Sequence, residues 1–160
     1  MNLVSIGTVY SPFPDPQGMP IQPSGASGEE GRIEIKAEYA EALQDLEGFS
    51  HLILLYHFHR CSGYSLKVKP FLDDQERGLF ATRAPRRPNP IGFSVVRLTA
   101  VEAPNLYILD VDVVDGTPLL DIKPYVPAFD SRENATTGWL EEKASQAKKL
   151  KADDRFRDPR

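Results

Sequence analysis

A stretch rich in proline and glycine near the N-terminus is the strongest constraint on the fold of this 160-residue chain. Five prolines and four glycines fall within residues 11–31: Pro12, Pro14, Pro16, Pro20, Pro23, Gly18, Gly25, Gly28 and Gly31. Proline removes an amide donor and glycine frees φ, so this stretch cannot form a regular helix or strand. Long irregular loops inside compact domains are uncommon and are usually functional or disordered. We therefore expect the stretch to contribute to a binding site.

Segments with β-strand character occupy most of the chain around this loop. Residues 51–59 are apolar on both faces, which is typical of a central strand. The other expected strands lie at residues 3–10, 33–35, 66–71, 79–82, 93–101 and 106–114. A helical turn is expected at Tyr39, Leu43 and Leu46, with Gly48 as its left-handed C-terminal cap. Asp115-Gly116 predicts a tight turn.

The C-terminal residues have a different pattern. Leu140, Ala144, Ala147 and Leu150 fall on one face of a helix, with charged residues opposite. Many strands in succession with few helices between them favour antiparallel pairing. The sequence therefore predicts a mainly β fold: a compact antiparallel β-barrel over residues 1–135 with a few short helices, followed by a C-terminal amphipathic helix and tail over residues 136–160.

The composition fits one globular domain, with 41% hydrophobic and 26% charged residues. The single cysteine, Cys61, rules out an intrachain disulfide and suits a reducing compartment. The chain contains neither an apolar run of membrane-spanning length nor the pattern of a signal peptide. We therefore expect a cytoplasmic protein that does not associate with a membrane.

The charge is unevenly distributed. The net charge of the chain is −4, but residues 67–87 hold six basic and three acidic residues and carry +3, which leaves −7 for the rest. A local basic patch on an acidic protein can direct a polyanion to one face. An ordinary solvated loop explains the same residues, and charge alone does not decide between the two.

His57, His59 and Cys61 raise the possibility of a metal site, because alternate residues of a strand face the same way. Same-face strand positions are widely spaced, however, and no carboxylate with a distinctive spacing completes the set. We expect no metal site.

Two polar loops remain as candidates for chemistry, since the sequence contains no Gly-x-Ser-x-Gly, Walker or dinucleotide fingerprint. Residues 83–92 combine three prolines with three arginines, so the guanidinium groups sit on a backbone of little freedom. Residues 115–125 combine carboxylate, ammonium and phenol groups, which suit acid–base chemistry. The structural alternatives are that the prolines of residues 83–92 only end strands, and that residues 115–125 form a turn with a surface ion pair.

Several ordered blocks of the sequence resemble the TsaA-like, or TrmO, family across roughly residues 3 to 130. They are Ile6-Gly7-Thr8-Val9 with Ser11-Pro12-Phe13, Leu46-Glu47-Gly48-Phe49-Ser50-His51-Leu52, Gly78-Leu79-Phe80-Ala81-Thr82-Arg83, Arg87-Pro88-Asn89-Pro90-Ile91-Gly92, and Asp115-Gly116-Thr117-Pro118 with Asp121-Ile122-Lys123-Pro124-Tyr125. The resemblance implies a compact β-barrel that binds S-adenosylmethionine, acts as a homodimer and methylates N6 of threonylcarbamoyladenosine beside the anticodon of tRNA.

The resemblance also implies roles for individual residues. The cofactor is expected against Gln22, Pro23, Ser24, His59, Arg60, Arg83, Phe93, Leu109, Asp110, Val111 and Asp112. Loss of a proton from the poorly nucleophilic ureido nitrogen suggests Asp121, Lys123 and Tyr125 as catalytic residues. Arg86 and Arg87 suit tRNA phosphates, and Asn89 suits a base edge or the threonyl carboxylate. Two alternatives stay open: a methyltransferase with another acceptor, and a cofactor-binding regulator or RNA-binding module without catalysis.

Overall fold

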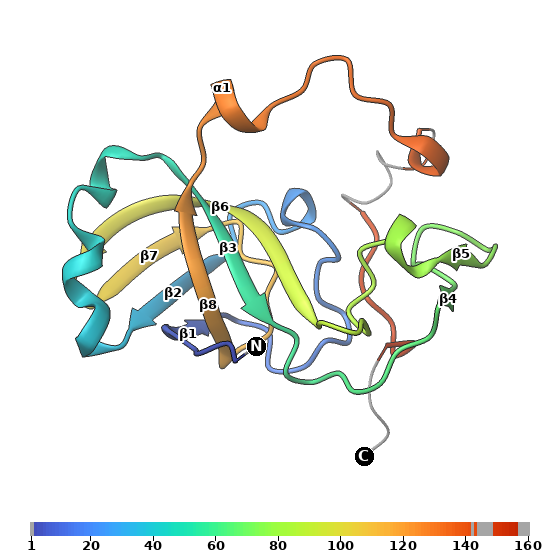
Figure 1. The fold of residues 1–160 in the computed structure, drawn as a ribbon, viewed down its shortest axis with the longest axis horizontal. Helices are drawn as coiled ribbons and strands as arrows, with labels where there is room; N and C mark the ends of the chain where they lie inside the picture. Colours follow the sequence, from blue (N-terminus) through green and yellow to red (C-terminus); the bar gives the residue numbers. More distant parts are fainter. Residues whose placement is uncertain (1, 142, 144–148, 157–160) are drawn as a thin grey trace.

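Six antiparallel strands close into a barrel in the order β1-β2-β7-β6-β3-β8 (Figure 1). The computed structural model describes residues 2–141, 143 and 149–156. The barrel strands are β1 (Gly7–Tyr10), β2 (Glu30–Ile35), β3 (His51–His57), β6 (Ile91–Glu102), β7 (Asn105–Leu109) and β8 (Thr117–Pro124). The prediction of a mainly β antiparallel barrel with few short helices is confirmed.

Strand β3 lies between β6 and β8, so its prediction as a central strand is confirmed. Alternate residues Leu52, Leu54 and Tyr56 point into the barrel and are buried. They join the core, which consists of Val9, Ile33, Ile35, Leu43, Leu52, Leu54, Tyr56, Val96, Leu106, Ile108, Val111, Val113 and Leu119. Burial of these apolar side chains is the main force that holds the barrel closed.

Short helices replace the predicted helical turn at residues 39–46. The chain forms two 3₁₀ helices, η2 (Ala37–Leu43) and η3 (Leu46–Gly48). The left-handed residue between them is Asp45, with φ of 64°, and not Gly48, which is the last residue of η3. The prediction of a glycine cap was wrong because an Asp side chain can also occupy the left-handed region.

Several predicted strands have different bounds. Strand β3 ends at His57, two residues early, and β1 takes only the second half of residues 3–10. Residues 66–71 contribute only β4 (Lys67–Val68), which pairs with β5 (Arg77–Gly78). Residues 79–82 form the 3₁₀ helix η4 (Leu79–Ala81) instead of a strand.

Two further corrections concern the end of the barrel sequence. The strand predicted at 106–114 stops at Leu109, because Asp110 adopts a left-handed φ of 67°. Residues 117–124, predicted to belong to a loop, form β8, which closes the barrel between β1 and β3. The charged residues and two prolines of β8 conceal it in the sequence, since both residue types are depleted in strands.

The β4–β5 pair stands beside the barrel, near the C-terminal end of β3 and the start of β6 (Figure 1). We use the name side lobe for residues 61–87 together with the described residues of 138–156. The remaining helices are η1 (Pro23–Gly25), α1 (Pro127–Asp130) and η5 (Gly138–Leu140). Most of the predicted C-terminal amphipathic helix lies outside the described residues. In the part of the chain described, no helix is long and apolar enough to cross a membrane.

Candidate functional site

A cavity of about 1040 Å³ lies where the barrel meets the side lobe and the proline-rich loop. Its size is at the upper end of the range for small-molecule sites, and its lining is mostly apolar with a few polar groups. Seven of the residues predicted to bind the cofactor line it: Gln22, Ser24, His59, Arg60, Arg83, Phe93 and Asp112. Residues from five separate parts of the sequence therefore meet in one cavity.

The Arg83 side chain connects two sides of the cavity rim. Its guanidinium donates a hydrogen bond of 2.9 Å to the side-chain oxygen of Gln22 in the proline-rich loop. The same guanidinium lies over the ring of Phe93 on β6, with its carbon 5.8 Å from the ring centroid. Phe93 is 45% exposed, so its ring is available to a ligand. A cation, an amide and an aromatic ring, those of Arg83, Gln22 and Phe93, therefore lie close together at the rim.

The floor of the cavity holds a chain of hydrogen bonds between Tyr56, Ser94 and Asp112. The Tyr56 hydroxyl lies 3.0 Å from the Ser94 hydroxyl, which donates a 2.6 Å hydrogen bond to the Asp112 carboxylate. Burial raises the pKa of Asp112 to about 6 and also raises the pKa of Tyr56. The Tyr56 ring packs directly on Gly92, where any side chain would collide with it. Glycine is therefore required at this position of β6.

His59 and Arg60 follow the end of β3 and line the cavity together. Burial, together with the positive charge of Arg60, lowers the pKa of His59, so its imidazole is neutral near pH 7. Because β3 ends at His57, His59 and Cys61 do not continue the strand face on which the metal alternative depended. Among the described residues, no group of three or more His, Cys, Asp or Glu side chains is arranged to hold a metal.

The loop of residues 83–92, which we call the arginine loop, packs against other residues of the side lobe. The Arg87 guanidinium donates hydrogen bonds to the backbone oxygens of Thr82, at 2.9 Å, and Ala84, at 3.4 Å. Arg86 donates to the backbone oxygen of Phe156 at 3.2 Å. Of the predicted substrate-binding residues, Arg87 lines the cavity, whereas Arg86 and the exposed Asn89 do not. Arg83, Pro85 and Arg87 of this loop form part of the cavity wall.

The four residues of segment 109–112 lie in different surroundings. Leu109 ends β7, and Val111 is buried in the barrel core. The Asp110 carboxylate forms a 2.6 Å ion pair with Arg97 and accepts the backbone N–H of Gly28 at 2.8 Å. Only Asp112 of this segment lines the cavity. Pro23, also predicted to bind the cofactor, begins η1 beside Gln22.

The predicted catalytic residues lie on or just after β8, away from the cavity lining. Asp121 and Lys123 form an ion pair of 2.8 Å and stand opposite Leu55 and Ile53 of β3. Tyr125 follows the strand, with its ring edge-on to that of His51. The structure therefore does not bring these three residues together with the predicted cofactor residues of the same chain.

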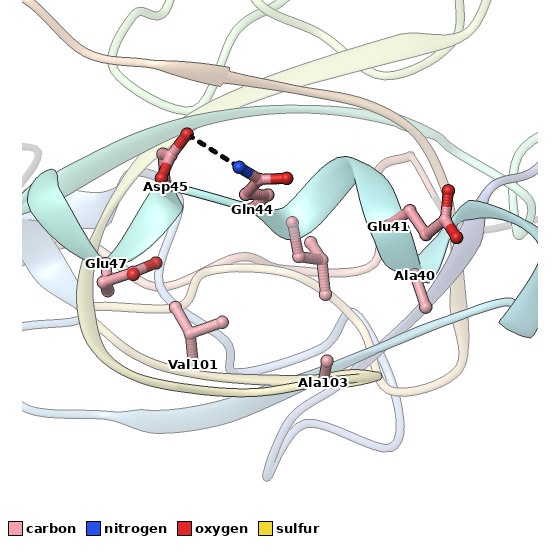
Figure 2. Close-up of a pocket in the computed structure, with 8 residues that line it drawn as sticks. Ala40, Glu41, Gln44, Asp45, Glu47, Val101 and Ala103 are labelled. Carbon is pink, nitrogen blue, oxygen red and sulfur yellow. Dashed lines mark hydrogen bonds between the residues drawn. The ribbon is translucent and has the colours of Figure 1, made fainter.

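A second hollow, of about 680 Å³, lies between the η2–η3 region and the end of β6 (Figure 2). Figure 2 shows the carboxylates of Glu41, Asp45 and Glu47 around it, with a 3.4 Å hydrogen bond from Gln44 to Asp45. Carboxylates repel phosphate groups, and none of the predicted site residues lines this hollow. The larger cavity is therefore the candidate functional site.

Residues 8–131 match the family model described as the tRNA-methyltransferase O N-terminal domain, which covers most of the chain. The chain belongs to the TrmO family. A Pyrococcus abyssi protein named "Probable S-adenosyl-L-methionine-binding protein" is 54% identical over 94% of this chain and 82% of its own length. The mouse tRNA (adenine(37)-N6)-methyltransferase is 40% identical over 81% of this chain and 32% of its own length. The crystal structure of TrmO from Pseudomonas aeruginosa is 41% identical, with a TM-score of 0.74, and the match covers 86% of this chain and 61% of that one.

Sequence reasoning missed Tyr56, Ser94 and Thr117, which also line the cavity. One signal was available for Ser94. It is a polar residue at an inward-facing position of β6, between buried Gly92 and Val96. A polar side chain at a core position needs a hydrogen-bond partner, and this requirement marks it for attention.

Proposed function

We propose that this protein is an S-adenosylmethionine-dependent methyltransferase that modifies N6 of threonylcarbamoyladenosine beside the anticodon of tRNA. The observation that carries the proposal is the meeting of seven predicted cofactor-binding residues around one cavity. Family membership over residues 8–131 supports the same activity. Several relatives are longer than this chain, so its activity on a whole tRNA is part of the proposal.

The cavity suits S-adenosylmethionine in size and chemistry. Its volume of about 1040 Å³ can hold a nucleoside joined to an amino acid. The Phe93 ring offers a surface for a base, and the Arg83 guanidinium suits a carboxylate. The Asp112 carboxylate suits an ammonium, amino or hydroxyl donor. When bound, the cofactor supplies a methyl group already activated by a sulfonium, so the protein mainly aligns the acceptor and excludes water.

We also propose that the protein acts as a homodimer through the outer face of β3 and β6. Ile53 and Leu55 point outward on β3, opposite Val95 and Phe93 of β6, and form an apolar surface next to Asp121. Phe93 belongs both to this surface and to the cavity. A second copy bound there would bring its Asp121, Lys123 and Tyr125 near the cavity rim, where a base is needed. In sedimentation, Leu55→Asp should convert a dimer into a monomer, and a wild-type monomer would contradict this part of the proposal.

The tRNA contacts follow from the basic residues around the rim. Arg60 and Arg83 are exposed there, and Arg86 and Arg87 are half-buried beside them. We assign phosphate binding to Arg86 and Arg87, with Asn89 reaching a base edge or the threonyl carboxylate. The activity is placed in the cytoplasm, the compartment that the single thiol favours.

The decisive test is methyl transfer to tRNA that carries unmethylated threonylcarbamoyladenosine. Labelled methyl should appear in that nucleoside, as read by mass spectrometry after digestion, and Arg83→Ala should reduce the incorporation. Lys36→Ala, an exposed basic residue that does not line the cavity, is the matched control. Cofactor binding without transfer would favour the regulator alternative, and transfer to another nucleoside would favour a different acceptor. A protein that shows no cofactor binding and no methyl transfer would overturn the proposal.

A further inference from the structure

Tyr56 and Ser94, which are hydrogen-bonded in series to Asp112 on the floor of the cavity, have no part in the roles assigned above. We propose that Tyr56 and Ser94 are positioning residues that fix the Asp112 carboxylate as the acceptor for an N–H or O–H donor of the cofactor. The inference rests on the proposed function, because it takes S-adenosylmethionine as the ligand of this cavity. It adds Tyr56 of β3 and Ser94 of β6 to the site. It also predicts that cofactor binding depends on the ionisation of Asp112.

The geometry fixes the direction of every hydrogen bond in the chain. A serine hydroxyl has one proton, and Ser94 donates it to the Oδ1 atom of Asp112 over 2.6 Å, a length typical of a bond to an ionised carboxylate. The Ser94 oxygen must then accept the proton of the Tyr56 hydroxyl, 3.0 Å away. Each bond therefore points toward Asp112, and the carboxylate is held in one orientation.

The burial of the hydrogen-bonded Tyr56 and Ser94 side chains indicates a role beyond packing. Tyr56 is 5% exposed and Ser94 is 1% exposed, and both face the barrel interior. Phenylalanine and alanine would fill these positions without the need to satisfy two hydroxyl groups. The Ser94 bond uses one lone pair of a carboxylate that has about four acceptor sites, and Asp112 lines the cavity. A bound donor can therefore reach the carboxylate while Ser94 still holds it.

The charges around Asp112 place its titration just below neutral pH. Tyr56 and Ser94 face it from β3 and β6, and Arg83 is the cation that acts on it from the rim. Burial outweighs both the Ser94 hydrogen bond and the Arg83 charge, so the pKa of Asp112 rises to about 6. Above this pH the carboxylate is an anionic acceptor, and below it the bound proton competes with the ligand donor.

Calorimetric titration of S-adenosylmethionine from pH 5 to pH 8 tests the proposal. Wild-type affinity should fall about tenfold from pH 7 to pH 5, because the ionised fraction of Asp112 falls by that factor. Ser94→Ala removes a donor to the carboxylate, so the midpoint should move to higher pH and affinity at pH 7 should weaken. Tyr56→Phe keeps the ring packed on Gly92 and should move the midpoint less, in the same direction.

Matched controls separate this effect from general destabilisation. Thr99→Ala removes a hydroxyl from the exposed part of β6, and Tyr107→Phe removes a phenol from β7, both outside the cavity lining. Both controls should keep the wild-type profile. In the cofactor-free protein, the carboxyl ¹³C signal of Asp112 should titrate near pH 6 in wild type and at higher pH in Ser94→Ala.

A shorter ligand identifies the donor. 5′-Methylthioadenosine lacks the amino-acid part, so a retained pH profile assigns the donor to the nucleoside and a lost profile assigns it to the ammonium; both support the inference. A wild-type profile that is flat from pH 5 to pH 8, or one that Ser94→Ala and Tyr56→Phe leave unchanged, would overturn it while the proposed function stands. Wild-type protein that binds no cofactor at any pH would overturn the proposed function instead.

Discussion

The barrel and the side lobe are each stabilised by a different kind of interaction. The barrel has continuous ladders of backbone hydrogen bonds around thirteen buried core residues. The side lobe has a two-residue strand pair and a small cluster of Val68, Leu79 and Ala84, with Phe156 packed against it. Many of its other contacts come from charged side chains. The Asp73 carboxylate forms ion pairs with Arg77 and Lys143. The Arg155 guanidinium donates hydrogen bonds to the backbone oxygens of Lys69 and Pro70.

The difference matters because the cavity lies between the two regions. Its floor belongs to the rigid barrel, whereas much of its wall depends on ion pairs and on arginine bonds to backbone oxygens. Ion pairs with carboxylates respond to pH and salt more than apolar packing does. We therefore expect the side lobe to loosen under conditions that leave the barrel folded. Three substitutions test this contrast, in order of decreasing effect on global stability.

Leu54→Ala should have the largest effect, because Leu54 is fully buried at the centre of β3. The cavity left by the side chain should cost about 2–5 kcal/mol of unfolding free energy. Urea denaturation followed by circular dichroism measures the loss. Leu66→Ala, at a residue that is 70% exposed, is the matched control and should change little. Equal losses in the two variants would show that apolar burial does not hold the barrel.

Arg87→Ala should destabilise the side lobe and leave the barrel folded. The substitution leaves the backbone oxygens of Thr82 and Ala84 without their guanidinium donor, at a cost of about 1–3 kcal/mol. Amide hydrogen exchange should become faster in residues 79–87 and stay slow in β3. Arg132→Ala is the control, because Arg132 donates to nearby backbone oxygens at the exposed end of α1. Faster exchange throughout the barrel would contradict the separation of the two regions.

Acid should detach the C-terminal segment before the barrel unfolds. Hydrogen bonds from Lys143 and Arg77 hold the pKa of Asp73 well below its ordinary value of 3.8, so its contacts stabilise the side lobe fully above about pH 4, and this stabilisation declines as the pH falls from there towards the lowered pKa. Trp139, the only tryptophan, donates to the backbone oxygen of Ala81 and reports the change by fluorescence.

At neutral pH, Asp73→Asn should give the fluorescence that the wild-type protein shows in acid, with little change in the barrel signal. Asp74→Asn removes an exposed ion pair with Lys69 and should leave the fluorescence unchanged. A single acid transition shared by Trp139 and the barrel signal would contradict a separable side lobe.

The sequence predicted the barrel better than the side lobe for a physical reason. Strand β3 is a run that is apolar on both faces and β6 is rich in β-branched residues, so both strands can be read from the local sequence. Contacts such as Lys143 with Asp73 join residues 70 positions apart and leave no local pattern. Strand β8 was missed because its charged residues and prolines conceal a strand whose partners are distant in sequence.

The candidate site was predictable only in part. The proline-rich loop was expected to form part of a site from its composition alone, and Gln22 and Ser24 of this loop do line the cavity. The resemblance to a known family supplied Phe93 and Asp112, which no local pattern singles out. The role of Arg87 as a clamp on backbone oxygens could not be read from the sequence, because rigid arginine-rich loops serve structure and phosphate binding equally well.

The most direct test of the central claim is a titration of the protein with S-adenosylmethionine followed by backbone amide NMR. We predict saturable shifts in residues that line the larger cavity, including Ser24, Arg83 and Phe93, and no shifts around Glu41 and Asp45 in the acidic hollow. Shifts confined to the acidic hollow, or no shifts at saturating cofactor, would contradict the assignment of the larger cavity as the cofactor site.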